Sequence, residues 1–333
     1  MAKSDKVKWG ILGCGKIAHK FASDLLLSES GVLFACASRN KDKAQEFAEK
    51  FDAVVFFDNY FELATCPEVD VIYVATPHSF HFEQTLLCLE HKKHVLCEKP
   101  MGLNEIQVKS MIAAATKNKV FLMEAMWTAF LPAIIQVKQM VNAGEIGDIR
   151  HIKADFGFRT LFDAQSRLFN PHLAGGSLLD IGIYPLYISL LLSGYPSFVQ
   201  SIAHLSDTGV DDECTILLQF PSGATASLYS TLICDTDTIC EIYGTKGKIT
   251  IPTRFHEQTH FYLQLNGDDE IEIKSGKKGF GYFHEIEHTN ACILNNMTES
   301  NIMTHSLSLQ LVRLMDDIRK QCGLIYPSER LDH

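Results

Sequence analysis

Three polar side chains could together move a proton to or from an alcohol oxygen: Lys99, Asp180 and Tyr184. Lys99 lies in Cys97-Glu98-Lys99-Pro100, directly after a short apolar run, where the following proline restricts its backbone. Asp180 and Tyr184 are four residues apart, so a helix over residues 178–190 would place them on one face. These residue types suit a general acid/base that works beside groups orienting the reacting oxygen.

A glycine-rich stretch near the start of the chain, Gly13-Cys14-Gly15-Lys16-Ile17-Ala18, has the pattern G-x-G-x-x-A between an apolar run and a helical pattern. Gly13 permits a tight turn, and Gly15 lets the backbone approach a pyrophosphate without an intervening Cβ atom. The backbone amides at the helix start, including those of Lys16 and Ile17, would face the anion. Ala18 is small enough for close helix–strand packing. The stretch predicts a dinucleotide-binding loop.

The end of the second apolar run indicates which nicotinamide dinucleotide binds. Sites that prefer NAD carry an acidic residue there for the ribose 2′-hydroxyl. This chain has Ser38 and Arg39 instead. Ser38 can hydrogen-bond a 2′-phosphate, and Arg39 can pair with it or stack on the adenine, although Arg39 could also be only an exposed residue at a helix start. We therefore predict NADP as cofactor, with NAD as the alternative.

Two more motifs follow apolar runs at the edge where open α/β sheets bind their ligands. One is Thr76-Pro77-His78, with His81 shortly after it, and the other contains Glu98 and Lys99. The carboxyl ends of parallel strands lie at one edge of the sheet, so both motifs would lie near the nicotinamide. The residues predicted to line the cofactor site there are Thr76, Pro77, His78, His81, Glu98 and Lys99.

Tyr184 is the candidate general acid/base. A tyrosine hydroxyl has an ordinary pKa of about 10, which the Lys99 ammonium and an oxidised nicotinamide would lower. Lys99 would then orient the substrate hydroxyl and stabilise a developing alkoxide, while Asp180 would bind substrate or position the lysine. The reverse assignment, with Lys99 transferring the proton, is also chemically possible.

Apolar runs alternate with amphipathic helical patterns over the first 126 residues. The runs cover residues 7–12, 32–37, 69–75, 94–97 and 120–123, and the helical patterns between them cover residues 17–27, 41–51, 79–91 and a stretch that Asn104 can cap. Continuous apolar strands separated by helices predict a parallel sheet covered on both faces. We predict a doubly wound α/β Rossmann domain over residues 1–126.

The pattern changes after residue 126. A helix near 130–143 and an apolar helix at 183–193 accompany short strands, with hairpin signals at Pro221-Ser222-Gly223 and Asn266-Gly267-Asp268. Two more helices are expected near 283–295 and 305–320. We predict an α+β domain over residues 127–333, built on an open-faced, mostly antiparallel or mixed sheet of about six strands. Its open face would be a large apolar patch on a monomer, which favours a homodimer or higher homo-oligomer.

Composition excludes several classes of protein. The chain has 333 residues, of which 46% are hydrophobic and 21% charged, as expected for a globular protein with a sizeable core. A net charge of −10 argues against nucleic acid as a partner. No apolar run is long enough for a membrane span and no secretory signal is visible. The ten cysteines lack C-x-x-C spacing, which predicts free thiols in a cytoplasmic protein and no metal site.

These motifs in this order resemble the Gfo/Idh/MocA oxidoreductase family: the glycine loop, Thr76-Pro77-His78 with His81, Glu98-Lys99-Pro100, and Gly175-Gly176 with Asp180 and Tyr184. The resemblance covers essentially the whole chain. It implies an NAD(P)-dependent enzyme that transfers hydride between its cofactor and a cyclic polyol, an aldose or a trans-dihydrodiol. It also implies a site containing Lys99, Asp180 and Tyr184. The chain departs from many relatives at Ala129, where they carry arginine, so we assign no cofactor contact there.

Two other functions fit the same fold. One is a regulator or scaffold that binds NADP and has no catalytic activity, although such a protein would need none of Lys99, Asp180 and Tyr184. The other is glycosidase-type hydrolysis with bound NAD, which occurs among relatives of this family. A screen of NADP⁺ reduction against sugars, inositols and dihydrodiols would separate these hypotheses.

Overall fold

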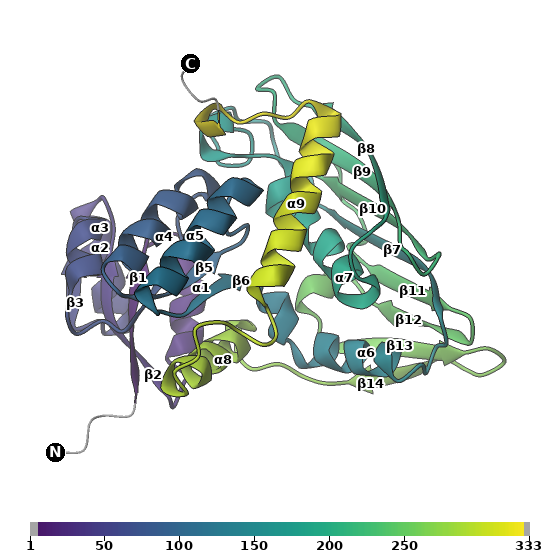
Figure 1. Cartoon of the computed structure of the whole chain (residues 1–333), viewed down its shortest axis with the longest axis horizontal. Coiled ribbons are helices and arrows are strands. Elements are labelled where there is room, and N and C mark those ends of the chain that lie inside the picture. The colour runs from purple at the N-terminus through teal and green to yellow at the C-terminus, as the bar shows by residue number, and fades with distance from the viewer. Residues whose placement is uncertain (1–5, 330–333) are drawn as a thin grey trace. The chain divides into compact units, whose positions relative to one another are not determined.

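The computed structural model describes residues 6–329, and the chain forms two compact units (Figure 1). The first unit comprises the chain up to Phe130 together with Lys278–Leu309, and the second comprises Leu131–Lys277 together with the chain from Gln310 on. Sequence analysis assigned residues 278–309 to the second domain. They belong to the first unit because helix α8 (Tyr282–Leu294) packs against α1 (Lys16–Leu25).

The first unit contains a parallel sheet of six strands in the order β3-β2-β1-β4-β5-β6. This doubly wound sheet is the predicted Rossmann architecture. Strand β3 and helix α3 were not predicted, because β3 has only three residues and all of them are half-buried at the edge of the sheet. The elements are β1 (Val7–Leu12), β2 (Gly31–Ala37), β3 (Val55–Phe57), β4 (Val71–Val74), β5 (His94–Glu98), β6 (Leu122–Ala125), α2 (Lys41–Phe51), α3 (Tyr60–Thr65), α4 (His81–Glu90) and α5 (Glu105–Asn118).

Aromatic packing and one buried carboxylate attach α8 to this sheet. Phe21 of α1 stacks on Tyr73 of β4 with ring centroids 3.7 Å apart, and its edge-on contact with Tyr282 of α8 has a centroid distance of 6.3 Å. Asp24, also on α1 and buried, accepts hydrogen bonds from the backbone N–H groups of Phe280, Gly281 and Phe283 at the start of α8. A carboxylate at a helix N-terminus also interacts favourably with the helix dipole.

The second unit contains an eight-stranded sheet in the order β14-β13-β12-β11-β7-β10-β9-β8. The expected size was about six strands, although strand-like segments near 149–158, 197–204, 213–220, 224–232, 238–243, 247–251, 260–266 and 270–274 correspond to all eight. All neighbouring strands are antiparallel except β7 and β10, which are parallel. The predicted hairpin turns join β9 to β10 and β13 to β14. The strands are β7 (Ile149–Gly157), β8 (Phe198–Leu205), β9 (Asp211–Gln219), β10 (Thr225–Thr231), β11 (Cys240–Gly244), β12 (Gly247–Ile251), β13 (His260–Leu265) and β14 (Ile271–Lys274).

One face of this sheet is covered by helices and the other is open in the chain. Helix α7 (Ile183–Ser193) packs on β7 and β10, and α6 (Pro132–Asn142) packs on β13. Figure 1 shows both helices on the same side of the sheet, and the remaining helix is α9 (His305–Cys322), which begins in the first unit and ends in the second. On the opposite face, β8 and β9 expose Phe198, Ile202 and Leu217, and the side chain of Ile202 is 74% exposed.

One helical segment, residues 171–193, is long and apolar enough by length and composition to cross a membrane, contrary to the expectation from sequence. Its mean hydropathy of 1.4 is explained by packing, because 89% of its most apolar window is buried inside the structure. We therefore interpret it as a core helix.

Candidate active site

The glycine loop joins β1 to α1, and its two glycines have different reasons to lack a side chain. Gly13 has φ +99°, and a Cβ atom there would lie 2.9 Å from the carbonyl oxygen of Ala75. Gly15 has an extended backbone, and a Cβ atom there would meet nothing within 4 Å. Folding therefore requires glycine at position 13, whereas the space beside Gly15 suits an external group such as a pyrophosphate.

Helix α1 also lacks the side-chain cap that α2, α3 and α5 have. Asn40, Asn59 and Asn104 cap α2, α3 and α5, and each accepts a hydrogen bond from a backbone N–H of its helix. Gly15 at the start of α1 provides no side-chain cap. The N–H groups of the first turn, which include those of Lys16 and Ile17, can therefore donate to a bound anion.

Ser38 and Arg39 lie where the prediction placed them, immediately after β2. The guanidinium of Arg39 lies 5.3 Å from the ring centroid of Phe80. Burial raises the pKa of Tyr60, and the Arg39 guanidinium nearby opposes this shift. No carboxylate follows β2 directly, since the residues after it are Ser38, Arg39 and Asn40. A cation at this place, without an adjacent acid, suits a ribose that carries a 2′-phosphate.

His81 was predicted to line the cofactor site. Its imidazole is fully buried, and its two ring nitrogens contact backbone carbonyl oxygens. Its Nε2 lies 2.8 Å from the carbonyl oxygen of Thr76, and its Nδ1 lies 2.8 Å from that of Pro100. Burial lowers the pKa of His81, and these two contacts oppose the shift. His81 therefore connects the segments that follow β4 and β5, so its contribution to the site is to position them. His78 is also buried, with its ring 5.7 Å from that of His81.

Glu98 is buried at the end of β5 and accepts a hydrogen bond from the Tyr73 hydroxyl. The negative charge of Glu98 acts on the carboxyl group of Glu285 on α8. Neither carboxyl oxygen of Glu285 has a hydrogen-bond partner among the described residues. Burial raises the pKa of Glu285 well above its ordinary value, and the charges of Glu98 and Asp24 raise it further. Glu98 therefore belongs to a group of buried side chains that includes Tyr73 and Glu285, and it directly precedes Lys99 in the chain. The prediction that Glu98 lines the cofactor site did not include this group.

Lys99 is half-buried, and the turn that follows it is fixed by a second buried carboxylate. Glu124 of β6 accepts a hydrogen bond of 2.9 Å from the backbone N–H of Met101. Burial raises the pKa of Glu124, which the Ser308 hydroxyl, the Met101 amide and the Lys99 charge oppose. Strands β1, β4 and β5 are parallel, so Lys99, the Thr76 segment and the glycine loop all lie at the carboxyl edge of this sheet.

In the second unit, Asp180 and Tyr184 are both buried, and they lie on a helix that begins as a π-helix. Residues Leu178–Gly182 form this wider turn, and α7 continues from Ile183. The prediction assumed a regular α-helix here. Arg167 makes a two-pronged ion pair with Asp180, with Nη1–Oδ1 and Nη2–Oδ2 distances of 2.8 and 3.3 Å. Both oxygens of Asp180 therefore face a guanidinium that the sequence analysis did not identify.

Two aromatic side chains beside Tyr184 were also missed. The ring of His256 lies 5.0 Å from that of Tyr184, and Phe156 of β7 stacks on His256 at 4.3 Å. His256 is buried in a short 3-10 helix, Phe255–Glu257. Nothing in the local sequence distinguishes His256 or Phe156 from core residues, because their place beside Tyr184 depends on the pairing of distant strands. The only local feature that could have indicated a role for Arg167 is that it lies close in the chain to Gly175-Gly176.

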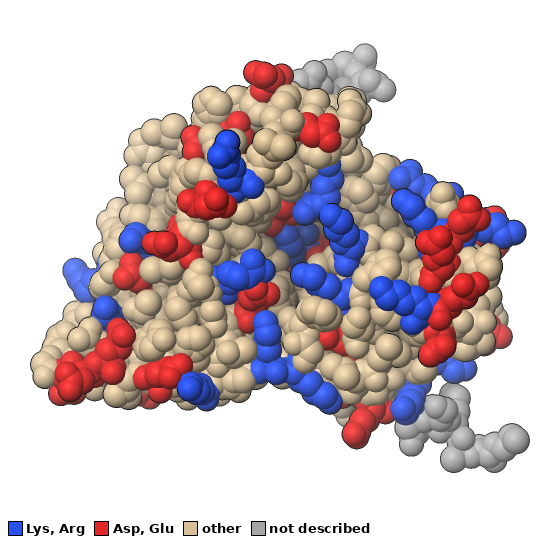
Figure 2. All heavy atoms as spheres, turned by 180° about the vertical axis from the view of Figure 1, so that it is seen from behind, with Lys and Arg blue, Asp and Glu red and all other residues tan. Residues whose placement is uncertain are grey.

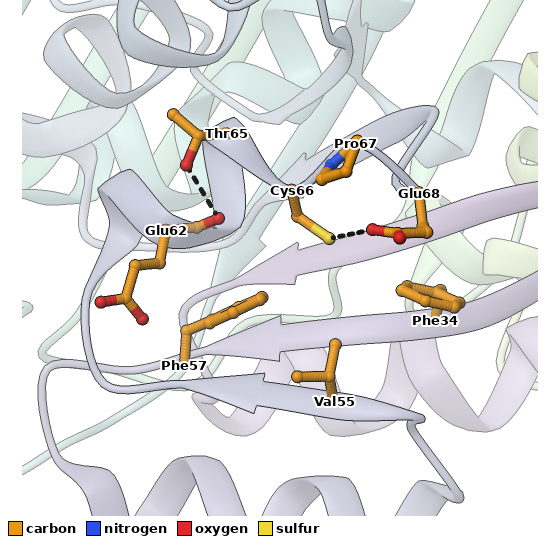
Figure 3. Close-up of a pocket in the computed structure, with 8 residues that line it drawn as sticks. All are labelled: Phe34, Val55, Phe57, Glu62, Thr65, Cys66, Pro67 and Glu68. Carbon is orange, nitrogen blue, oxygen red and sulfur yellow. Dashed lines mark hydrogen bonds between the residues drawn. The ribbon is translucent and has the colours of Figure 1, made fainter.

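A shallow cavity of about 500 Å³ opens elsewhere on the first unit, beside β2, β3 and α3 (Figure 3). Figure 3 shows the Cys66 thiol directed at Glu68, with a hydrogen bond of 3.3 Å between them. None of the predicted catalytic or cofactor residues lines this cavity. Its lining residues are Phe34, Val55, Phe57, Glu62, Thr65, Cys66, Pro67 and Glu68.

A parallel β3-β2-β1-β4-β5-β6 sheet whose first helix follows a glycine loop without a side-chain cap is typical of a dinucleotide-binding protein. Half-buried Lys99 and buried Asp180 and Tyr184 are residue types that an oxidoreductase could use for proton transfer. Residues 7–126 match the model of the oxidoreductase family with an NAD-binding Rossmann fold, and residues 134–250 match the GFO/IDH/MocA C-terminal domain. The chain belongs to the Gfo/Idh/MocA oxidoreductase family.

Relatives and solved structures agree with this assignment over nearly the whole chain. Trans-1,2-dihydrobenzene-1,2-diol dehydrogenases from Danio rerio and Homo sapiens are 35% and 33% identical, and each match covers 97% of this chain and 99% of the relative. An aldose-aldose oxidoreductase from Caulobacter crescentus, solved with glycerol, has a TM-score of 0.87 at 28% identity, covering 96% of this chain and 98% of that one. A 3-ketoreductase from Actinomadura kijaniata, solved with NADP and TDP-benzene, has a TM-score of 0.86 at 25% identity, covering 95% and 98%.

The two loop glycines give a paired prediction. We expect Gly13→Ala to lower the free energy of unfolding by about 1–3 kcal/mol, because alanine is strained at positive φ and its Cβ would meet Ala75. We expect Gly15→Ala to retain stability and to weaken NADPH binding about 10-fold or more, because its methyl group would fill the space for the phosphate. Urea unfolding and fluorescence titration measure the two effects. Unchanged NADPH affinity in Gly15→Ala would show that no phosphate binds there.

Proposed function

We propose that the chain is an NADP-dependent dehydrogenase that oxidises a secondary or anomeric alcohol of a cyclic polyol, an aldose or a trans-dihydrodiol. The observation that carries the proposal is that Lys99 lies at the same sheet edge as the uncapped glycine loop. The relatives with dihydrodiol dehydrogenase activity, and the aldose-aldose oxidoreductase fold, support this class of substrate.

Bound NADP⁺ supplies the hydride acceptor, and the residues of this chain supply proton transfer and orientation. Tyr184 takes the proton from the substrate hydroxyl as the general base. Lys99 donates a hydrogen bond to the same oxygen and stabilises its developing negative charge. Asp180, held by Arg167, positions a substrate hydroxyl. The buried surroundings of Asp180 and Tyr184 favour these interactions, because solvent competes less for the polar groups.

Substitution of the two central side chains tests this assignment. We expect Tyr184→Phe and Lys99→Met each to lower kcat by about 100-fold or more. NADPH binding should persist in both variants, because the glycine loop is intact. The assay is NADP⁺ reduction with the best substrate from a screen of pentoses, hexoses, inositols and dihydrodiols, and Lys109→Met on the exposed face of α5 is the control.

Turnover close to that of the unchanged protein in both variants would rule out this catalytic pair. Tight NADPH binding without activity towards any compound of the screen would instead favour a regulator that senses the nucleotide. Exchange of substrate hydrogen with solvent, without net NADPH formation, would favour glycosidase-type chemistry.

The preference for NADP over NAD is assigned to Arg39. We expect Arg39→Ala to weaken NADPH binding roughly 10- to 100-fold, the value of one or two charge-assisted hydrogen bonds, and to leave NADH binding nearly unchanged. Lys50→Ala, at the far end of α2, is the matched loss of one positive charge. An equal loss of affinity for both nucleotides would show that Arg39 does not recognise the 2′-phosphate.

We also propose a cytoplasmic homodimer that forms through the open face of the second sheet. All ten cysteines are free, which suits a reducing compartment. Figure 2 shows acidic and basic side chains interspersed over the face in view, whereas β8 and β9 expose Phe198, Ile202 and Leu217. Exposed apolar side chains grouped on one face of a sheet suit a subunit interface.

Sedimentation at micromolar concentration tests the dimer. We expect Ile202→Asp to produce monomers, because it places a charge on the open face. Ile106→Asp, on the similarly exposed side chain of α5, should leave the assembly unchanged. A monodisperse monomer of the unchanged chain would contradict the proposal.

A further inference from the structure

Asp211, the first residue of β9, is a buried carboxyl group that has no place in the mechanism above. Asp211 is 1% exposed to solvent. Oδ2 accepts a hydrogen bond of 2.8 Å from the Ser177 hydroxyl and one of 2.6 Å from the backbone N–H of Leu178. Oδ1 has no hydrogen-bond partner among the described residues.

Keeping a carboxyl group in this position costs free energy. Burial is the main reason that the pKa of Asp211 rises to about 7, while the two hydrogen bonds from Ser177 and Leu178 act in the opposite direction. An asparagine could accept the same two bonds without a buried charge, and an apolar residue would avoid the cost of desolvation. The two accepted hydrogen bonds, which an asparagine could also accept, are therefore the property of this group that can serve the site, because they hold a neighbouring segment.

Asp211 holds the start of the π-helix that carries Asp180. The π-helix begins at Leu178, and its N-cap residue Ser177 makes no side-chain bond to the helix. The Ser177 hydroxyl instead contacts Asp211 and, at 2.9 Å, the hydroxyl of Ser230 on β10. The cap is therefore supplied from the sheet, so the helix start is fixed directly to strands β9 and β10.

Two glycines make this close approach possible. Gly176 has φ +120°, and a Cβ atom there would lie 2.2 Å from Oδ1 of Asp211. Gly182, at the end of the π-helix, would place a Cβ atom 2.9 Å from the Ser230 hydroxyl. Because these two positions have no side chain, Asp211 of β9 can approach the start of the π-helix and Ser230 of β10 can approach its end.

We propose that Asp211 is a positioning residue for the reaction, acting through Ser177 and Leu178 to fix the π-helix and thereby Asp180 and Tyr184. π-Helices are rare and frequently occur at functional sites, and this one has an anchor outside its own sequence. Small displacements of reacting groups lower rates strongly, so loss of the anchor should affect turnover more than binding. The inference rests on the proposed dehydrogenase function.

Three variants test the role. Asp211→Ala removes the acceptor, and we expect kcat to fall about 10-fold or more with the KM for NADP⁺ unchanged, since the cofactor loop belongs to the first unit. Asp211→Asn keeps an acceptor oxygen and should restore kcat to within about 3-fold of the unchanged protein. Asp212→Ala, which removes an ion pair with His204 from the next residue of the strand, is the control and should behave like the unchanged protein.

Amide hydrogen exchange provides a readout that does not depend on activity. In Asp211→Ala, exchange should increase over residues 177–184 and remain unchanged in α1, whereas Asp211→Asn should preserve protection of both segments. Cooperative urea unfolding followed by circular dichroism shows that each variant is folded, because NADPH binding would report on the first unit alone. Ser177→Ala, which removes one of the two bonds, should lie between the unchanged protein and Asp211→Ala.

The outcomes separate this inference from the proposed function. Normal kcat and normal exchange in Asp211→Ala overturn the positioning role, whatever the substrate. Equal losses of kcat in the alanine and asparagine variants overturn it as well, because the hydrogen bonds would then not be the cause. If the unchanged protein oxidises no substrate of the screen, the proposed dehydrogenase function fails, and the exchange data alone decide whether Asp211 anchors the helix.

Discussion

The backbone N–H groups at the start of α1 have no side-chain cap, and the proposed binding of the cofactor in the first unit depends on this feature. Helices α2, α3 and α5 each have an asparagine cap, and α4 continues from the 3-10 turn His78–Phe80 without a side-chain cap. The start of α1 differs from both, because it has Gly15 with open space beside it. An anion completes the helix start, and the sheet order then brings the segments after β4 and β5 to the same edge.

Much of this unit could be predicted because its signals are local. The glycine loop, the Asn104 cap and the alternation of buried strands with helices depend on residues close together in the chain, and the structure confirms them. The short edge strand β3 was missed because three half-buried residues carry no periodic pattern. Helix α8 was predicted, but its attachment to α1 depends on Asp24, whose partners are far away in the sequence.

The candidate site of the second unit could be predicted less completely. Asp180 and Tyr184 were identified from their motif, whereas the contacts that define their environment come from other segments. Arg167 reaches Asp180 from a loop, and His256 reaches Tyr184 from a 3-10 helix after β12. The predicted helix over 183–193 is confirmed as α7. A π-turn leaves no pattern in the sequence that distinguishes it from an α-helix, so the form of the turn over residues 178–182 could not be predicted.

The contact between Gly176 and Asp211 also constrains how this chain can vary. A side chain at position 176 would need the space that the carboxyl group occupies, and a smaller residue at 211 would leave the helix start without its acceptor. The two positions are therefore coupled, although the π-helix, α7 and β8 separate them in the chain. Among homologous sequences, an exchange at one of them should be accompanied by an exchange at the other, and designers who graft this helix onto another scaffold must transfer both.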